Sequence, residues 1–149
     1  MAEGTRIPGV PPEGYRIVGQ IVSTNPLRFL PDTDCTTVAT ELVTAHTTGA
    51  PVVDRDDKII GFISEIDLLR ALCDGWELSR LRAEEVMTPC AVDVEETTLI
   101  AEAIRVMDEF HLYNLPVRVD GHVRYSVTRH DLLRAWVGLG LSREPATTG

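Results

Sequence analysis

The sequence contains the same unit twice, and this repetition constrains the fold more than any other feature. The segment GFISEIDLLRAL (Gly61–Leu72) aligns with YSVTRHDLLRAW (Tyr125–Trp136), and Asp67 corresponds to Asp131 at a constant offset of 64 residues. Upstream, GAPVVD matches NLPVRVD, and TTVATEL matches TTLIAEAI. A unit of roughly 60 residues buries little apolar surface alone, so we expect both copies to pack as one pseudo-symmetric domain.

Each copy predicts the same elements. In the second copy, apolar residues recur at helical spacing on one face, namely Leu99, Ile100, Ala103, Ile104, Met107 and Phe110. Pro116 then ends this helix, and two short strands follow with a polar turn at 120–122 between them. A second helix follows Ser64 or Thr128, and we expect its buried side chains to be Leu68, Leu69 and Leu72, or Leu132, Leu133 and Trp136. The sequence thus predicts an α/β (α+β) fold of tandem β-α-β-β-α repeats.

Two departures from strict repetition are visible. Thr36 and Pro51 are 15 residues apart, whereas Thr97 and Pro116 are 19 apart, so we expect the first helix of the first copy to lack about one turn. Tyr125 stands where the first copy has a glycine, and its ring could close part of a pocket or stack on a base. We place an N-terminal arm at 1–20, the repeats at 21–82 and 83–141, and a tail at 142–149.

Composition excludes several classes of function. The formal net charge is -9 with a single lysine, so no basic stripe exists for nucleic acid. No apolar run could span a bilayer and no signal peptide is apparent, so a soluble cytoplasmic protein without membrane contact is expected. The three cysteines form no CxxC pair and are expected to be small core residues, and the four histidines lack metal-ligand spacing. No catalytic motif is present, so we expect neither an enzyme nor a required cofactor.

The strings GAPVVDRDDKIIGFISEIDLLRAL and LPVRVDGHVRYSVTRHDLLRAW resemble the core of the cystathionine-β-synthase (CBS) repeat. The resemblance covers nearly all of residues 21–140. It implies a pseudo-two-fold Bateman module, in which paired repeats enclose clefts for adenosine-containing ligands and two modules associate into a homodimer. The ligand would be AMP, ADP, ATP or S-adenosylmethionine.

The same resemblance implies two sites. In each, the acid of a Ser/Thr-x-x-Asp motif would hold the ribose hydroxyls. The first, which we call site A, would consist of Thr24, Thr48, Gly49, Ala50, Thr128 and Asp131. The second, site B, would consist of Ser64, Asp67, Thr88, Tyr113, Asn114 and Leu115.

The residues inside the two motifs differ in charge. Arg129 and His130 stand inside the motif of site A and would face a phosphate, whereas Glu65 of site B would repel one. Site A should therefore prefer phosphorylated ligands. Site B should be empty, weak, or suited to a ligand without phosphate.

A structural interpretation of the motif stands beside the functional one. A Ser or Thr three residues before an acid at a helix start is also a capping box, which stabilises helices in proteins that bind nothing. Two functions therefore stay open. One is an adenine-nucleotide sensor that dimerises and signals to an unknown separate protein effector. The other is a ligand-free scaffold that uses the same helices only to dimerise or dock.

Overall fold

The computed structural model describes residues 17–22 and 24–138, so most of the expected arm and the whole tail at 142–149 lie outside the described residues. The first repeat contains helix α1 (Cys35–Ala45), strands β1 (Gly49–Val53) and β2 (Ile59–Ser64), and helix α2 (Glu65–Cys73). The second repeat follows the same order, with α4 (Ile100–Phe110), β5 (Asn114–Val119), β6 (His122–Thr128) and α5 (Arg129–Trp136). The predicted fold class is confirmed.

The strand expected before each first helix is very short. In the second repeat it is β4 (Val94–Glu95), which pairs parallel with β5. In the first repeat it is a single parallel bridge between Phe29 and Val52. A further short strand, β3 (Thr88–Pro89), pairs with β2, so the two sheets have the orders β1-β2-β3 and β4-β5-β6.

Both hairpins turn at polar residues, as predicted. Asp54 accepts hydrogen bonds from the backbone N–H groups of Asp56 and Lys58 through its Oδ1 atom, at 2.8 and 3.0 Å. In the second hairpin, Asp120 and Gly121 have φ values of 53° and 81°. Two consecutive left-handed residues match the right-handed twist of the strands that they join.

The expected shortening of the first helix is wrong. Helices α1 and α4 both have 11 residues, and each ends at a histidine in the left-handed conformation, His46 or His111 with φ 54°. The pairs of threonines that were aligned are not equivalent. Thr36 lies in the first turn of α1, whereas Thr97 lies in the turn before α4. Similar sequence at different structural positions thus produced a false gap.

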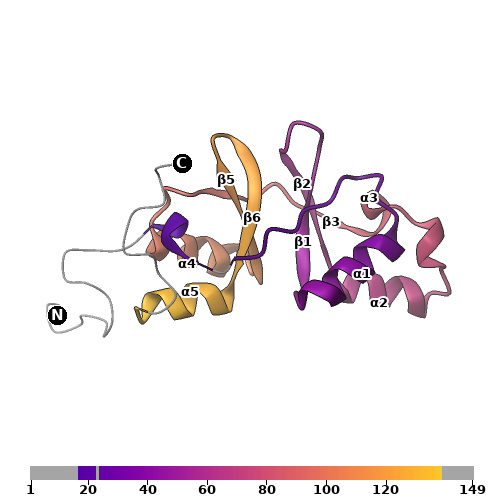
Figure 1. Cartoon of the computed structure of the whole chain (residues 1–149). Coiled ribbons are helices and arrows are strands. Elements are labelled where there is room, and N and C mark those ends of the chain that lie inside the picture. The colour runs from indigo at the N-terminus through magenta and orange to yellow at the C-terminus, as the bar shows by residue number, and fades with distance from the viewer. Residues whose placement is uncertain (1–16, 23, 139–149) are drawn as a thin grey trace, which may run out of the picture.

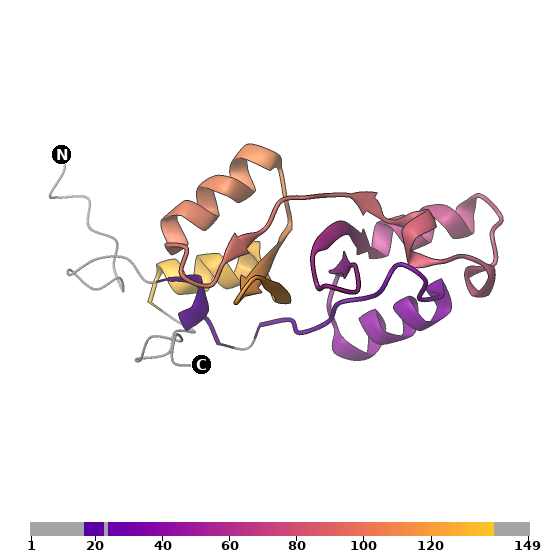
Figure 2. The same cartoon turned by 90° about the horizontal axis from the view of Figure 1, so that it is seen from above.

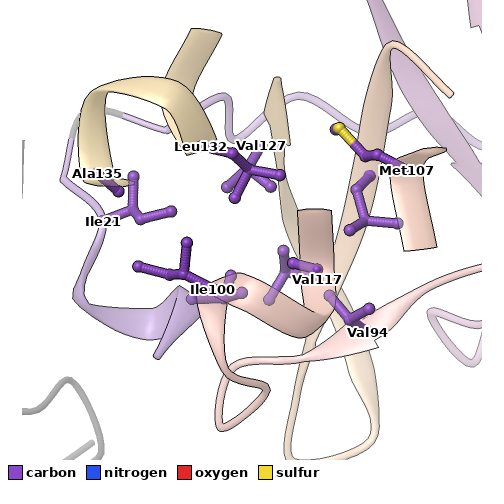
Figure 3. Close-up of a cluster of buried hydrophobic side chains, with 11 residues drawn as sticks. Ile21, Val94, Ile100, Met107, Val117, Val127, Leu132 and Ala135 are labelled. Carbon is purple, nitrogen blue, oxygen red and sulfur yellow. The ribbon is translucent and has the colours of Figure 1, made fainter. Parts of the chain in front are cut away.

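Each repeat has its own core, and the two hairpins meet between them with each pair of helices on the outer side (Figures 1 and 2). The first core contains Phe29, Cys35, Val38, Leu42, Ala50, Val52, Ile63, Leu68 and Ala83. The second contains Val18, Ile21, Val94, Ile100, Ala103, Met107, Leu115, Val117, Val127, Leu132 and Ala135, most of which Figure 3 labels.

Three of the leucines that were expected in the cores are exposed. Leu69, Leu72 and Leu133 expose 54%, 49% and 64% of their surface, while alanines at 71 and 135 are buried in the second helices instead. Cys73 is likewise exposed, although Cys35 is buried. The second helices therefore present an apolar outer face. Tyr125 is half-buried and packs against the second core. Its role beside a pocket or a base stays a prediction.

The segment at the start of each repeat packs against the other repeat. The 3-10 turn η2 (Val18–Gln20) bonds to the second repeat, where Val18 and Gly19 donate backbone hydrogen bonds to Thr98 and Glu96, both at 2.8 Å. Helix α3 (Ala83–Val86) bonds to the first repeat, where the Ala83 N–H donates to the Thr33 carbonyl at 2.7 Å. The expected division between residues 82 and 83 stays a prediction about the repeats in sequence. It does not separate the two cores, because Ile21 of the first repeat packs in the second core and Ala83 of the second repeat packs in the first.

A network that we call the hairpin contact joins the tips of the two hairpins. Asp57, with φ 60°, lies at its centre. The Asp57 carboxylate lies 3.2 Å from Arg28, 3.5 Å from His122 and 3.6 Å from Arg124. Lys58 Nζ also donates to the Gly121 carbonyl at 2.6 Å. The relative placement of the two repeats is thus supported by charged and polar bonds at this end.

Candidate functional site

Site A begins at the N-terminus of α5. Thr128 caps this helix through Oγ1, which accepts the Asp131 N–H at 3.0 Å, and Asp131 Oδ2 accepts the Thr128 N–H at 2.9 Å. Asp131 is only 8% exposed, and its other carboxylate oxygen lies 4.0 Å from Arg134. The motif therefore forms the capping box that the structural interpretation predicted.

The wall of site A from the first repeat is the start of β1. Gly49 pairs with Ser64 across the hairpin, and the Thr48 carbonyl accepts the Glu65 N–H at 2.9 Å. A side chain at Gly49 would collide with the Phe62 ring and the Ile63 carbonyl, at 2.6 and 2.8 Å from its Cβ. Ala50 points into the first core, so it could offer a ligand only backbone atoms.

The structure brings the segments of site A together through a residue that the sequence analysis missed. Asn25 follows Thr24, pairs with Ser126 near the start of α5, and donates a side-chain hydrogen bond to the Gly49 carbonyl at 2.9 Å. The Asn-Pro dipeptide at 25–26 is a turn signal that could have drawn attention to this residue.

Arg129 is turned towards other residues of its own repeat. Its Nε donates to the Leu112 carbonyl at 2.7 Å, and its guanidinium carbon lies 4.2 Å from the centre of the Tyr113 ring. A planar guanidinium over an aromatic ring is an attractive cation–π arrangement. His130 is exposed. To reach a phosphate in site A, the Arg129 side chain would have to leave Tyr113.

Site B contains three side chains in contact. Asp67 Oδ2 accepts the backbone N–H of Ser64 at 2.9 Å and its hydroxyl at 3.0 Å. Asp67 Oδ1 accepts the Thr88 hydroxyl at 3.4 Å. Two of the three predicted segments of site B therefore meet.

The three residues of the third segment of site B, 113–115, differ in burial. Tyr113 is 70% exposed, and Leu115 is fully buried in the second core. Asn114 is 7% exposed, and its buried Oδ1 atom has no hydrogen-bond partner. Within 17–22 and 24–138, no hydrogen bond joins this segment to Ser64, Asp67 or Thr88.

An apolar groove of about 560 Å³ lies on the outer face of the second repeat. It is lined by Ala101, Ile104, Met107, Asp108, Arg129, Leu132, Leu133 and Trp136. This groove lies between α4 and α5, and its lining includes Arg129 from the motif of site A.

Two further features bear on the kind of site. No helix within the described ranges is long and apolar enough to cross a membrane. No three His, Cys, Asp or Glu side chains in this part of the chain gather where they could hold a metal ion.

The CBS domain family model matches residues 18–74 and 83–138. The chain therefore belongs to the CBS-domain family, and the two repeats together form the paired arrangement known as a Bateman module.

Solved structures agree with this assignment. CBSX2, a CBS-pair protein of Arabidopsis thaliana that has been crystallised with AMP, is 26% identical with a TM-score of 0.66, over 82% of this chain and 96% of that one. The CBS domain pair of protein MJ0100 has the same fold, with a TM-score of 0.71 and 24% identity over 84% of this chain and 98% of that one.

The similarity to an enzyme is partial. Arabinose 5-phosphate isomerase KdsD of Escherichia coli O6:H1 is 33% identical over 96 residues, which cover 64% of this chain and 29% of the isomerase. The chain thus spans less than a third of that relative, and the match lies in its CBS region.

Proposed function

We propose that this protein is a regulatory module that binds an adenosine-containing ligand between its repeats, with AMP, ADP or ATP favoured, and signals to a separate partner protein. The assembly of site A carries this proposal. Asp131 is a buried carboxylate at a helix N-terminus, and Asn25 bonds both to Gly49 of the other repeat and to Ser126, five residues before Asp131, which supports a site shared by the two repeats. A carboxylate suits two ribose hydroxyls, and a helix N-terminus suits a phosphate.

The AMP complex of CBSX2 supports the ligand class, since that protein matches most of this chain. Calorimetric titration of the whole protein with AMP, ADP, ATP and S-adenosylmethionine tests the proposal. Saturable binding of one of them at micromolar concentration is expected. No heat and no thermal stabilisation with any of the four would overturn it.

A ligand-free scaffold is the second candidate function, and one observation favours it. Both motif acids already accept hydrogen bonds from their capping partners, Ser64 for Asp67 and Thr128 for Asp131. These bonds explain the motif without a ligand. The scaffold predicts an unchanged stability in the presence of every nucleotide, so the same titration separates the two functions.

We also propose that the module is a homodimer that associates through its helices. Leu69, Leu72 and Leu133 are exposed on the second helices, and Trp76 exposes 59% of its surface just beyond α2. The groove between α4 and α5 is mainly lined by apolar side chains. Exposed apolar side chains and an apolar groove commonly mark a protein interface, and a second copy offers matching apolar side chains.

A further inference from the structure

Asn25 lies where the chain passes from one repeat to the other. Before it, Ile21 is packed in the second core; after it, Phe29 is packed in the first core and bridges to Val52. The segment 24–28 therefore spans the boundary between the repeats, and Asn25 touches both of them.

The main chain of Asn25 is bonded to the second repeat. The Ser126 N–H donates to the Asn25 carbonyl at 2.9 Å, and the Asn25 N–H donates to the Ser126 carbonyl at 3.2 Å. Ser126 is completely buried in β6, two residues before Thr128. This pair of bonds fixes the segment beside the wall that carries the α5 motif.

The side chain of Asn25 is bonded to the first repeat. Nδ2 donates to the Gly49 carbonyl at 2.9 Å and to Thr47 Oγ1 at 3.0 Å, and lies 3.4 Å from Ser126 Oγ. Oδ1 accepts the Leu27 N–H at 3.1 Å. A carbonyl can only accept and a backbone N–H can only donate, so these partners define the orientation of the amide.

We propose that Asn25 is the positioning residue of site A: it holds the start of β1 and the N-terminus of α5 at a fixed separation before a ligand arrives. This inference rests on the proposed function, because it concerns the same site. Walls that are already ordered lose less conformational freedom when a ligand binds, which raises affinity. Asn25 itself acts through Gly49 and Ser126.

Site B lacks a comparable connection. In its crossing segment the Cys90 N–H donates to Ile60 of the first repeat at 3.3 Å, and Thr88 bonds to Asp67 of that same repeat. On the opposite wall, Asn114 Oδ1 has no partner. In site A, one side chain thus bonds to both repeats, whereas Thr88 and Cys90 beside site B bond to the first repeat.

The Asn25→Asp variant tests this inference, because it preserves the shape of the side chain and replaces the N–H donor by a negatively charged carboxylate oxygen. Asn25→Leu, which has a similar size and no charge, controls for repulsion between that charge and the phosphate of AMP. An oxygen would then face the Gly49 carbonyl. Titrations are made with AMP in an Asp67→Ala background, where site A remains, and with S-adenosylmethionine, which carries no phosphate, in an Asp131→Ala background, where site B remains. We expect Asn25→Asp to weaken AMP binding about tenfold in the first background, because the hydrogen bonds that Nδ2 donates to Gly49 and Thr47 are lost together with the ordered wall. Ligand binding in the second background should not change.

Hydrogen exchange of the ligand-free protein provides an independent readout. Asn25→Asp should increase exchange at both 47–50 and 126–128 while 57–59 stays protected. Asp57→Asn is the matched control, because it removes bonds between the repeats without touching site A. Absence of binding of all four ligands, AMP, ADP, ATP and S-adenosylmethionine, by the unmodified protein would refute the proposed function alone, and the exchange result would still decide whether Asn25 holds the walls. Unchanged exchange, or an affinity loss no larger than that of Asp57→Asn at equal stability, would overturn the inference.

Discussion

The backbone carbonyl of Asp57 accepts a hydrogen bond from the backbone N–H of Val123 at 2.8 Å, which joins the turn of one hairpin to the neighbouring hairpin. Around this bond, the Asp57 carboxylate meets Arg28, His122 and Arg124. One residue thus combines a main-chain bond to the second repeat with contacts to three basic side chains, of which His122 and Arg124 belong to that repeat.

The Asp57→Asn variant should lower the free energy of unfolding by about 1 kcal/mol, because partly exposed ion pairs each contribute little but two arginines, Arg28 and Arg124, share this carboxylate. The loss should shrink as salt is added, since ions screen exposed charges. Urea denaturation at low and high salt measures both. Asp120→Asn is the control, since Asp120 has a similar φ of 53° in the other turn and is exposed. Equal losses for both variants would contradict a specific role for Asp57.

The Asp131→Ala variant should lower AMP affinity at least tenfold, because the contact to ribose hydroxyls is lost. It should lower stability by only about 1 kcal/mol, the typical contribution of a helix cap. Calorimetry and thermal melting of the same preparation give the two numbers. A loss of stability with unchanged affinity would instead identify Thr128 and Asp131 as a capping box only.

The two sites should differ in their preference for phosphate. Arg129→Glu should lower the affinity for AMP several-fold, by a long-range electrostatic effect on the order of 1 kcal/mol. Asp67→Ala should barely change that affinity. Because Arg129 now lies over Tyr113, Tyr113→Ala should free the guanidinium and strengthen AMP binding modestly. One strong site for each chain is the expected stoichiometry. Two equal sites, or AMP affinity that depends on Asp67 and not on Arg129, would contradict this assignment.

A dimer is expected at micromolar concentration, and Leu133→Asp should dissociate it. Leu133 is 64% exposed beside the apolar groove, so a carboxylate there costs little within one chain but would be buried in the interface. Light scattering gives the mass, with Leu133→Met as the conservative control. A mass of 16.4 kDa for the unmodified protein would exclude the dimer.

Stability should fall in alkaline solution. Burial, with a smaller contribution from the Glu96 charge, raises the pKa of Tyr125 to about 12. The phenol is therefore protonated in the folded protein where it ionises in the unfolded chain, so its contribution is complete below pH 10 and lost as pH rises towards 12. Tyr125→Phe should reduce the pH dependence of the urea midpoint between pH 10 and 12. Burial also raises the pKa of Cys35 to about 11, so part of the alkaline loss should remain in this variant.

Local patterns were sufficient to predict the repeats, both hairpins and the caps of the second helices. Asp120 and Gly121 specify a tight turn by their own conformational preferences, and Thr128 and Asp131 are three residues apart in one helical turn. Such features depend on neighbours in sequence. Family resemblance added the grouping of segments into sites, which spacing alone does not give.

Other features depend on contacts between distant segments. Helical spacing placed Leu69 and Leu72 on an apolar face, but Leu68 and Ala71 occupy the core because α2 packs with a different face inwards. Asn25 acquires its importance only when Gly49 and Ser126 lie on either side of it. The charge of Arg129 was evident, yet its direction depends on the Leu112 carbonyl and the Tyr113 ring.

The crossing of the N-terminal segment sets an order for folding during synthesis. The first core is complete once Met87 has left the ribosome, since its members lie between Leu27 and Met87. Val18 and Ile21 are made earlier, but their partners include Leu132 and Ala135, near the end of the described chain. Domains fold as their residues emerge from the ribosome. These two apolar side chains therefore stay unburied after the first repeat has folded, until the second repeat has been made. The earliest described residues to be made are thus among the last to be buried.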